Sequence, residues 1–169
     1  MSRIARGIIA EFQHESANTR KMIERAPEDK FDWKPHEKSM TLGRLATHLA
    51  ELPQLSGTIV DQDELDLAGS DYQPTTAGSV AELLELFDKN AEAFIESVGE
   101  RSNEELFAEW SLRVGEHVVT ALPKIAAMRG FILSHAVHHR GQLSVFLRLL
   151  DVPLPQIYGP TADDAGAFG

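Results

Sequence analysis

Apolar side chains recur at helical spacing in several stretches of the chain, and this pattern predicts four amphipathic helices. The helical stretches are about residues 3–26, 41–60, 79–99 and 123–151. Pro27 ends the first stretch, and Ser79 with Glu82 three positions later marks the start of the third as a capping box. Pro53 removes a backbone donor inside the second stretch, so we expect a kink or a break there.

The segments between these helices differ in character. Residues 27–40 contain two prolines and mixed charge without periodicity, which predicts a surface loop. Residues 61–78 combine an acidic cluster with glycine, serine and proline, so we expect a solvated linker. Residues 111–123 alternate around Gly115 like a pair of short strands. The pattern therefore favours an all-α fold with a short β excursion before the last helix.

The last predicted helix carries two histidines in the middle of its apolar stripe. The stripe advances by three or four residues through Ile125, Met128, Ile132, His135, His139, Gln142, Phe146 and Leu149. Imidazoles four residues apart lie one turn above each other, so both rings can reach one ion at about 2.0–2.1 Å. His138 lies roughly 100° around the helix from His139, so we expect it to flank such a site. Two core histidines with hydrogen-bond partners would give the same pattern, and this alternative stays open.

A third ligand would have to come from another helix. His48 lies on the apolar stripe of the second stretch, between Leu45 and Leu52, and is the third candidate. A histidine at the edge of that stripe, in contact with solvent, is the alternative for His48. The sequence contains no cysteine, so a metal site here is confined to histidine, carboxylate and water ligands. We expect the remaining histidines, at positions 14, 36 and 117, to lie at the surface.

Composition and charge narrow the range of partners. A chain of 169 residues with 43% hydrophobic residues is large enough to form one domain, residues 1–169, with its own core. Its 16 basic and 26 acidic residues give a formal charge of −10, which disfavours binding to nucleic acid. The sequence shows neither a long apolar run nor a secretion signal pattern, so we expect a soluble cytoplasmic protein without a membrane partner.

Three short segments give the chain a recognisable pattern. They are THLAEL around His48, HAVHHRGQL at residues 135–143 and PQIYGP at residues 155–160. In this order and separation they make the whole chain resemble the DinB/YfiT-like family of metalloenzymes. The resemblance implies a four-helix bundle with one non-adjacent connection, and a divalent metal held by three histidines. By position in the motifs, these ligands are His48, His135 and His139.

The resemblance also suggests classes of activity. The family includes enzymes that transfer low-molecular-weight thiols or isomerise thiol adducts, together with many members of unknown activity. Three imidazoles leave a Zn²⁺ or Ni²⁺ ion with at least one open position, as in catalytic sites. We therefore expect a metal-dependent enzyme acting on a small molecule, of the thiol transferase or hydrolase kind. A non-catalytic metal-binding stress-response protein and a helical interaction module with buried histidines are the alternatives.

Two further expectations concern the general base and the oligomeric state. Glu51, one turn after His48, and Glu15 in the polar middle of the first helix are candidate bases, although that polar middle would by default face solvent. The third helix has more apolar residues than one core-facing stripe needs, namely Leu83, Leu84, Leu86, Phe87, Phe94 and Ile95. A homodimer would bury this surplus, and the resemblance also favours one.

Overall fold

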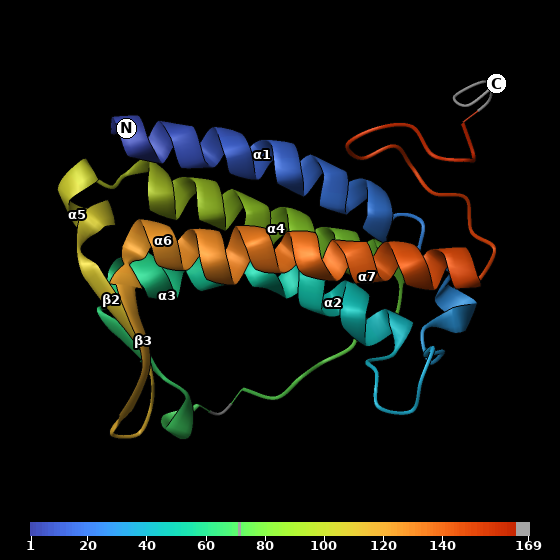
Figure 1. Ribbon diagram of the computed structural model, residues 1–169, viewed down its shortest axis with the longest axis horizontal. Helices are drawn as coiled ribbons and strands as arrows, with labels where there is room; N and C mark the ends of the chain where they lie inside the picture. Colours follow the sequence, from blue (N-terminus) through green and yellow to red (C-terminus); the bar gives the residue numbers. More distant parts are fainter. Residues whose placement is uncertain (71, 165–169) are drawn as a thin grey trace.

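The computed structural model describes residues 1–70 and 72–164, and these are mostly helical with a small sheet (Figure 1). In chain order the elements are α1 (Arg3–Ile23), η1 (Glu28–Lys30), α2 (Leu42–Glu51), η2 (Leu52–Gln54), α3 (Leu55–Asp61), β1 (Glu64–Asp66), η3 (Leu67–Gly69), α4 (Val80–Gly99), α5 (Asn103–Phe107), β2 (Glu109–Val114), β3 (His117–Pro123), α6 (Lys124–Met128), η4 (Arg129–Ser134) and α7 (His135–Leu149). No helix in the described part of the chain is long and apolar enough to cross a membrane.

The predicted helix boundaries have identifiable local causes. The Thr41 side chain accepts a hydrogen bond from the Arg44 amide and caps α2, and Ser79 caps α4 through the Glu82 amide. Glu82 itself accepts from the Gly78 amide, one residue before the cap. The break expected at Pro53 is confirmed, because α2 ends at Glu51 and a turn of 3-10 helix separates it from α3.

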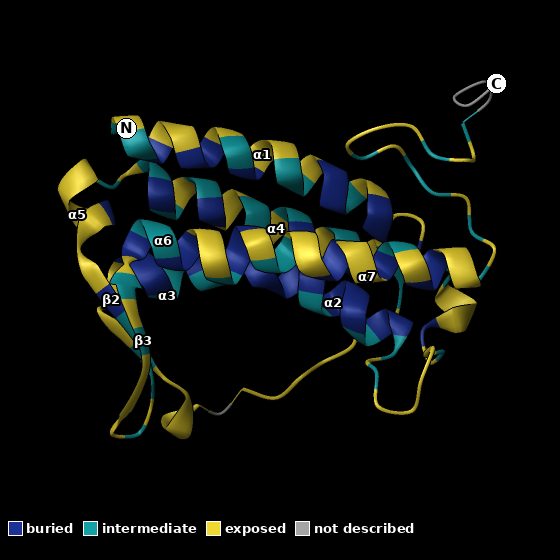
Figure 2. Cartoon of the chain, viewed as in Figure 1, coloured by how far each residue is buried: buried dark blue, intermediate teal, exposed yellow. Residues whose placement is uncertain are grey.

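The long helices lie side by side and bury their apolar faces against one another (Figures 1 and 2). One core cluster joins α2 and α7 to facing parts of α1 and α4, and a second joins α3, α6 and η4 to the other parts of α1 and α4. Both α1 and α2 pack against α4 and α7. The helices α1 and α2 follow each other in the chain but pack mainly against other helices, and the same is true of α4 and the α6–α7 helix. The chain therefore has two connections between non-adjacent helices, whereas one was expected.

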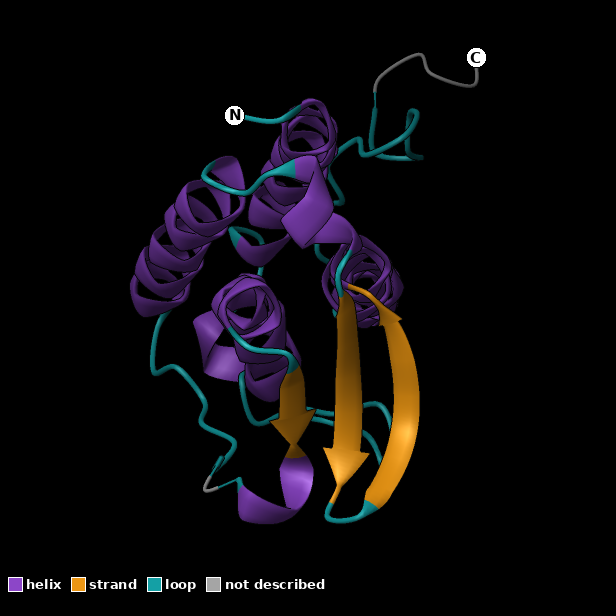
Figure 3. Cartoon of the chain, turned by 90° about the vertical axis from the view of Figure 1, so that its left-hand side faces the viewer, coloured by secondary structure: helices purple, strands orange, loops and turns teal. Residues whose placement is uncertain are grey.

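A three-stranded sheet corrects the prediction of an all-α fold. The strands lie together at one end of the helices in the order β1-β2-β3 (Figure 3). The hairpin of β2 and β3 around Gly115 is the predicted β excursion, and Gly115 has the positive φ of 60° that its turn requires. The strand β1 was missed, because it is only three residues long and its parallel partner lies more than 40 residues away in the sequence.

The last helix contains a π-helical turn, η4, immediately before the histidines. A π turn holds more residues than an α turn, so the register of the helix beyond it shifts relative to an unbroken 3.6-residue period. After this turn the buried residues are His139, Arg140, Leu143, Phe146 and Leu147. Within α7 the predicted stripe is confirmed at His139 and Phe146 but is wrong at Gln142, which is exposed, and at Leu149, which is 59% exposed.

The surplus apolar residues of α4 have partners within the chain. Leu84 and Leu86 are half-buried against one core cluster, and Ile95 is half-buried against the other. This packing accounts for part of the surface on which the homodimer was predicted, and dimerisation itself stays a prediction.

Candidate metal centre

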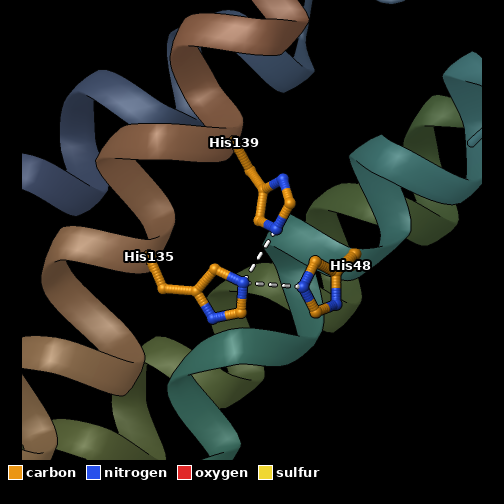
Figure 4. A group of neighbouring side chains, drawn as sticks. All are labelled: His48, His135 and His139. Carbon is orange, nitrogen blue, oxygen red and sulfur yellow. Dashed lines mark hydrogen bonds between the residues drawn. The ribbon is translucent and has the colours of Figure 1, made fainter. Parts of the chain in front are cut away.

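Three imidazoles from two helices converge on one point (Figure 4). His48 comes from α2, His135 begins α7 directly after the π turn, and His139 follows one turn later. The Nε2 atom of His135 lies 2.8 Å from Nε2 of His139 and 3.4 Å from Nε2 of His48. The ligand atoms of all three lie within 4.8 Å of one another. The structure thus brings together the three residues that the sequence selected, close enough to hold a metal ion.

The other ring nitrogens show how the protons are arranged. Nδ1 of His135 lies 3.3 Å from the Phe131 carbonyl oxygen, and Nδ1 of His139 lies 2.7 Å from Oε1 of Gln142. A carbonyl or amide oxygen only accepts, so each Nδ1 must carry a proton and donate it. In a neutral imidazole the remaining nitrogen, Nε2, then has an unprotonated lone pair. Hydrogen bonds of this kind orient ligand histidines in metal sites.

The proton arrangement disfavours a pair of hydrogen-bonded core histidines. A proton between the two facing Nε2 atoms would make one ring cationic, because both Nδ1 atoms are already protonated. Burial lowers the pKa of His135 and of His139 below the ordinary value, although the hydrogen bonds that the two rings donate to Phe131 and Gln142 act in the opposite direction. Neutral rings would therefore leave two lone pairs facing each other at 2.8 Å, and a cation between them relieves that repulsion.

The spacing of the nitrogens suits one metal ion. Two ligands at about 2.0–2.1 Å from an ion are about 2.9 Å apart when they subtend a right angle, and about 3.4 Å apart at the tetrahedral angle. The separations of His135 from His139 and from His48 are 2.8 and 3.4 Å, and all three ligand atoms lie within 4.8 Å of one another. Burial, with smaller contributions from the neighbouring His139 and His135, lowers the pKa of His48 to about 4. All three rings are therefore neutral near pH 7 and available as ligands.

Glu51 supports the third imidazole rather than lying free in the site. Its carboxylate is 4.0 Å from Nδ1 of His48 and is held by Arg44 at 2.6 Å. Tyr72 and Thr75 also donate hydroxyl hydrogen bonds to it, at 3.0 and 3.1 Å. At 4.0 Å the carboxylate does not hydrogen-bond His48, but its negative charge stabilises positive charge at the cluster. Because it is already engaged by three partners, its geometry favours this supporting role over that of a general base.

Glu15, the other candidate base, lies in a different cluster. Its carboxylate accepts hydrogen bonds at 2.6 Å from Arg140 and from Tyr158. These bonds outweigh the effect of burial and lower the pKa of Glu15. The buried Arg140 also binds Thr19, so the polar middle of α1 is partly buried, contrary to the expectation that it would face solvent. Glu15, Thr19, Arg140 and Tyr158 thus form one hydrogen-bonded cluster, the Arg140 cluster, which connects the tail segment to α1. None of these residues lines the cleft described next.

A cleft of about 580 Å³ opens beside two of the three histidines. Its lining residues are His48, Glu51, Leu52, Gln54, Leu55, Thr58, Leu65, Leu67, Ser70, Tyr72, Leu112, Phe131 and His135. The volume lies within the ~300–1,000 Å³ that is typical of small-ligand sites. One wall comes from residues 61–78, which were predicted to be only a solvated linker. The alternation of Leu65 and Leu67 was the available signal for that wall, but it is too short to distinguish a strand from a linker.

The remaining histidines lie outside the cluster, as predicted. His14, His36 and His117 are exposed. His138 is exposed as well, and its Nε2 lies 3.1 Å from the Gln142 amide nitrogen. This contact orients the Gln142 amide so that its oxygen faces His139. His138 therefore flanks the cluster without joining it.

The fold and the converging imidazoles define a mostly helical protein with a histidine cluster able to hold a metal ion. Residues 1–166 match the DinB family, and the chain belongs to that family. The uncharacterised protein YrdA of Bacillus subtilis (strain 168) is 24% identical over 161 residues, which cover 94% of this chain and 90% of YrdA.

Two crystal structures share the fold. A DinB-like protein from Bacillus cereus ATCC 10987 matches with a TM-score of 0.70 and 22% identity, over 90% of this chain and 97% of that one. The DinB-like protein YjoA of Bacillus subtilis matches with a TM-score of 0.70 and 20% identity, over 89% and 97% of the two chains. At such identities the likeness establishes the fold and leaves the activity to be argued from the site.

Proposed function

We propose that this DinB-family protein binds a divalent metal ion, Zn²⁺ or Ni²⁺, through His48, His135 and His139. The proposed activity is a metal-dependent reaction on a small molecule, with thiol transfer as the first candidate and hydrolysis as the second. The observation that carries the proposal is the convergence of three Nε2 atoms, two of which belong to rings whose Nδ1 protons are committed to acceptors. The strongly acidic chain and the small-ligand volume of the cleft favour a small molecule over nucleic acid.

An ion at this position supplies Lewis acidity, which lowers the pKa of a bound thiol or water toward neutrality. The chain's own residues supply the orientation. Phe131 and Gln142 fix the rings of His135 and His139, while Glu51 balances positive charge on the side of His48. Three neutral imidazoles leave the 2+ charge of the ion uncompensated, so an anionic donor such as a thiolate or hydroxide is favoured.

The cleft favours an enzyme over a closed metal-binding protein. His48 and His135 both line it, so a small molecule that occupies the cleft can approach the cluster directly. A purely structural metal site is normally closed by four protein ligands, whereas this cluster offers three histidines and an approach from solvent. The scaffold that we propose for this site is a four-helix bundle formed by α1, α2–α3, α4 and α6–α7, in a cytoplasmic protein.

Two measurements on the purified protein test the proposal. Elemental analysis should find about one divalent metal per chain, and His135→Ala or His139→Ala should abolish that stoichiometry while His138→Ala keeps it. The metal-loaded protein should then transfer a low-molecular-weight thiol to an electrophile, or hydrolyse an ester without thiol. Absence of metal from protein refolded with Zn²⁺ or Ni²⁺ would refute the metal site, and metal without turnover would point to the non-catalytic alternative.

A further inference from the structure

The cleft beside the histidines has a predominantly apolar wall. Leu65 of β1 and Leu112 of β2 are register partners in the parallel pair, so their side chains lie on the same face of the sheet. Both line the cleft, together with Leu52 and Leu55 of the segment that follows α2. Phe131, from the π turn, completes this wall next to His135. The sheet, of which the sequence predicted only the hairpin, therefore shapes the space in front of the cluster.

The cleft also lacks a positive side chain that could receive an anionic group. Among its described lining residues there is no lysine or arginine, and Glu51 is the one carboxylate. The nearby Arg44 is committed to Glu51 at 2.6 Å, and it also donates to Tyr72 and to the Thr75 carbonyl oxygen. A carboxylate entering between the leucines would lose its hydration without gaining an ionic partner, which is costly.

We infer that the cleft selects a small molecule with one metal-binding donor at one end and an uncharged, apolar body. This inference rests on the proposed function, because the donor end is assigned to the metal at His48, His135 and His139. The apolar body would lie between the leucines of the sheet and those that follow α2. Thiols or substrates that carry several carboxylates are disfavoured in this cleft, whereas alkyl or aromatic ones are favoured.

Calorimetric titration of the Co²⁺-loaded protein with thiols tests the inference directly. Lengthening an n-alkanethiol should tighten binding by about fourfold for each CH₂ group, the equivalent of ~0.8 kcal/mol. Ethanethiol and 1-butanethiol should therefore differ by about 15-fold. The matched acid 4-mercaptobutyrate should bind at least about tenfold more weakly than 1-butanethiol, because its carboxylate has no partner in the cleft. Equal or tighter binding of the acid, or no dependence on chain length, would overturn the inference.

Substitutions in the cleft wall test whether the dependence of affinity on chain length arises there. Leu112→Asn should reduce the gain per CH₂ group, and Leu67→Asn, at a position 47% exposed, should do so with little cost to folding. Leu149→Asn is the matched control, since Leu149 is 59% exposed on α7 and does not line the cleft. Gln54→Lys, at an exposed lining position, should raise the affinity for 4-mercaptobutyrate and leave that for 1-butanethiol unchanged. Identical behaviour of the cleft variants and the control would contradict the assignment.

A measurement on metal-free protein separates this inference from the proposed function. The apolar wall does not depend on the metal, so apo-protein should bind n-alkyl alcohols in ligand-observed NMR with the same preference for longer chains. If metal fails to bind but this preference is present and lost in Leu112→Asn, the proposed function fails and the apolar cleft stands. If metal binds and the preference is absent, the inference fails and the metal site stands.

Discussion

Metal should stabilise the folded protein, and the effect should depend on His135 above all. His135 is the shared vertex of the cluster, since its Nε2 atom lies 2.8 Å from that of His139 and 3.4 Å from that of His48. Its replacement by alanine removes both close contacts and leaves two ligands on different helices. The exposed His138, three residues along the same helix, offers a control because it lies beside His139 but its ring nitrogens are not among those that converge.

The magnitude follows from binding linkage. An ion present at one hundred times its dissociation constant stabilises the native state by about 2.7 kcal/mol. For a chain of 169 residues, each kcal/mol raises the melting temperature by about 2–4 °C. Metal at that concentration should therefore raise the melting temperature of the wild-type protein by roughly 5–10 °C. In His135→Ala the same addition should raise it by no more than a degree or two.

Differential scanning calorimetry of chelator-treated and metal-loaded samples measures these shifts. The wild-type protein and His138→Ala should show the full shift, whereas His135→Ala and His139→Ala should lose most of it. The assignment of the cluster would be refuted if the two ligand variants kept the shift, or if His138→Ala lost it. Equal melting temperatures of apo- and metal-loaded wild-type protein would mean that no metal binds the folded state preferentially.

Four other outcomes are expected. Glu51→Gln should weaken metal binding by about 10–100-fold in a chelator competition titration, because His48 loses its carboxylate neighbour; unchanged affinity would remove that role. Arg140→Leu should lower the free energy of unfolding by about 3–5 kcal/mol in urea, because Glu15 loses its partner, while metal stoichiometry stays the same. Folding lowers the pKa of His48 from 6.5 to about 4, so on acidification the unfolded apo-chain takes up the proton before the folded one does. The free energy of unfolding of the apo-protein should therefore be highest above pH 6.5 and fall by up to ~3 kcal/mol toward pH 4. Urea titrations at several pH values measure this fall, and a flat profile would contradict it. Light scattering should give about twice the monomer mass of 18.7 kDa, and the monomer mass at micromolar concentration would reject the homodimer.

The family resemblance and the positions of the three histidines were accessible from the sequence. His135 and His139 lie four residues apart, and the α-helical period alone places such residues on one face. His48 was found by the same reasoning on a second helix, and the structure brings it to the other two. The breaks at Pro27 and Pro53 were equally predictable, because proline acts on the backbone of its own neighbourhood.

The cleft and the supporting contacts were decided by the tertiary structure. Glu51 was visible as a carboxylate near His48, and Arg44, which pairs with it, lies on the same helix. Its contacts with Tyr72 and Thr75, however, depend on the segment after α3 approaching α2. Glu15 was an equally plausible base until the structure paired it with Arg140, which lies more than 100 residues away in the sequence. A charge pattern in the sequence shows which groups can pair, whereas packing selects which of them do.

The sheet also has one part that local sequence signals predict and one part that depends on tertiary contacts. The hairpin of β2 and β3 was predicted because its alternation and its turn glycine are local signals. The strand β1 has only three residues and takes its backbone partners from β2, so its own sequence is too short to specify it. The buried face of α7 likewise lies away from Leu149, because that face is the one that packs against α1 and α2, and packing selects it. The sequence by itself determined the helices and the candidate ligand residues because these depend on short-range periodicity. The approach of His48 to His135, the hydroxyl contacts that Tyr72 and Thr75 make with Glu51, and the apolar wall of the cleft depend on contacts between distant segments, and only the folded chain creates those.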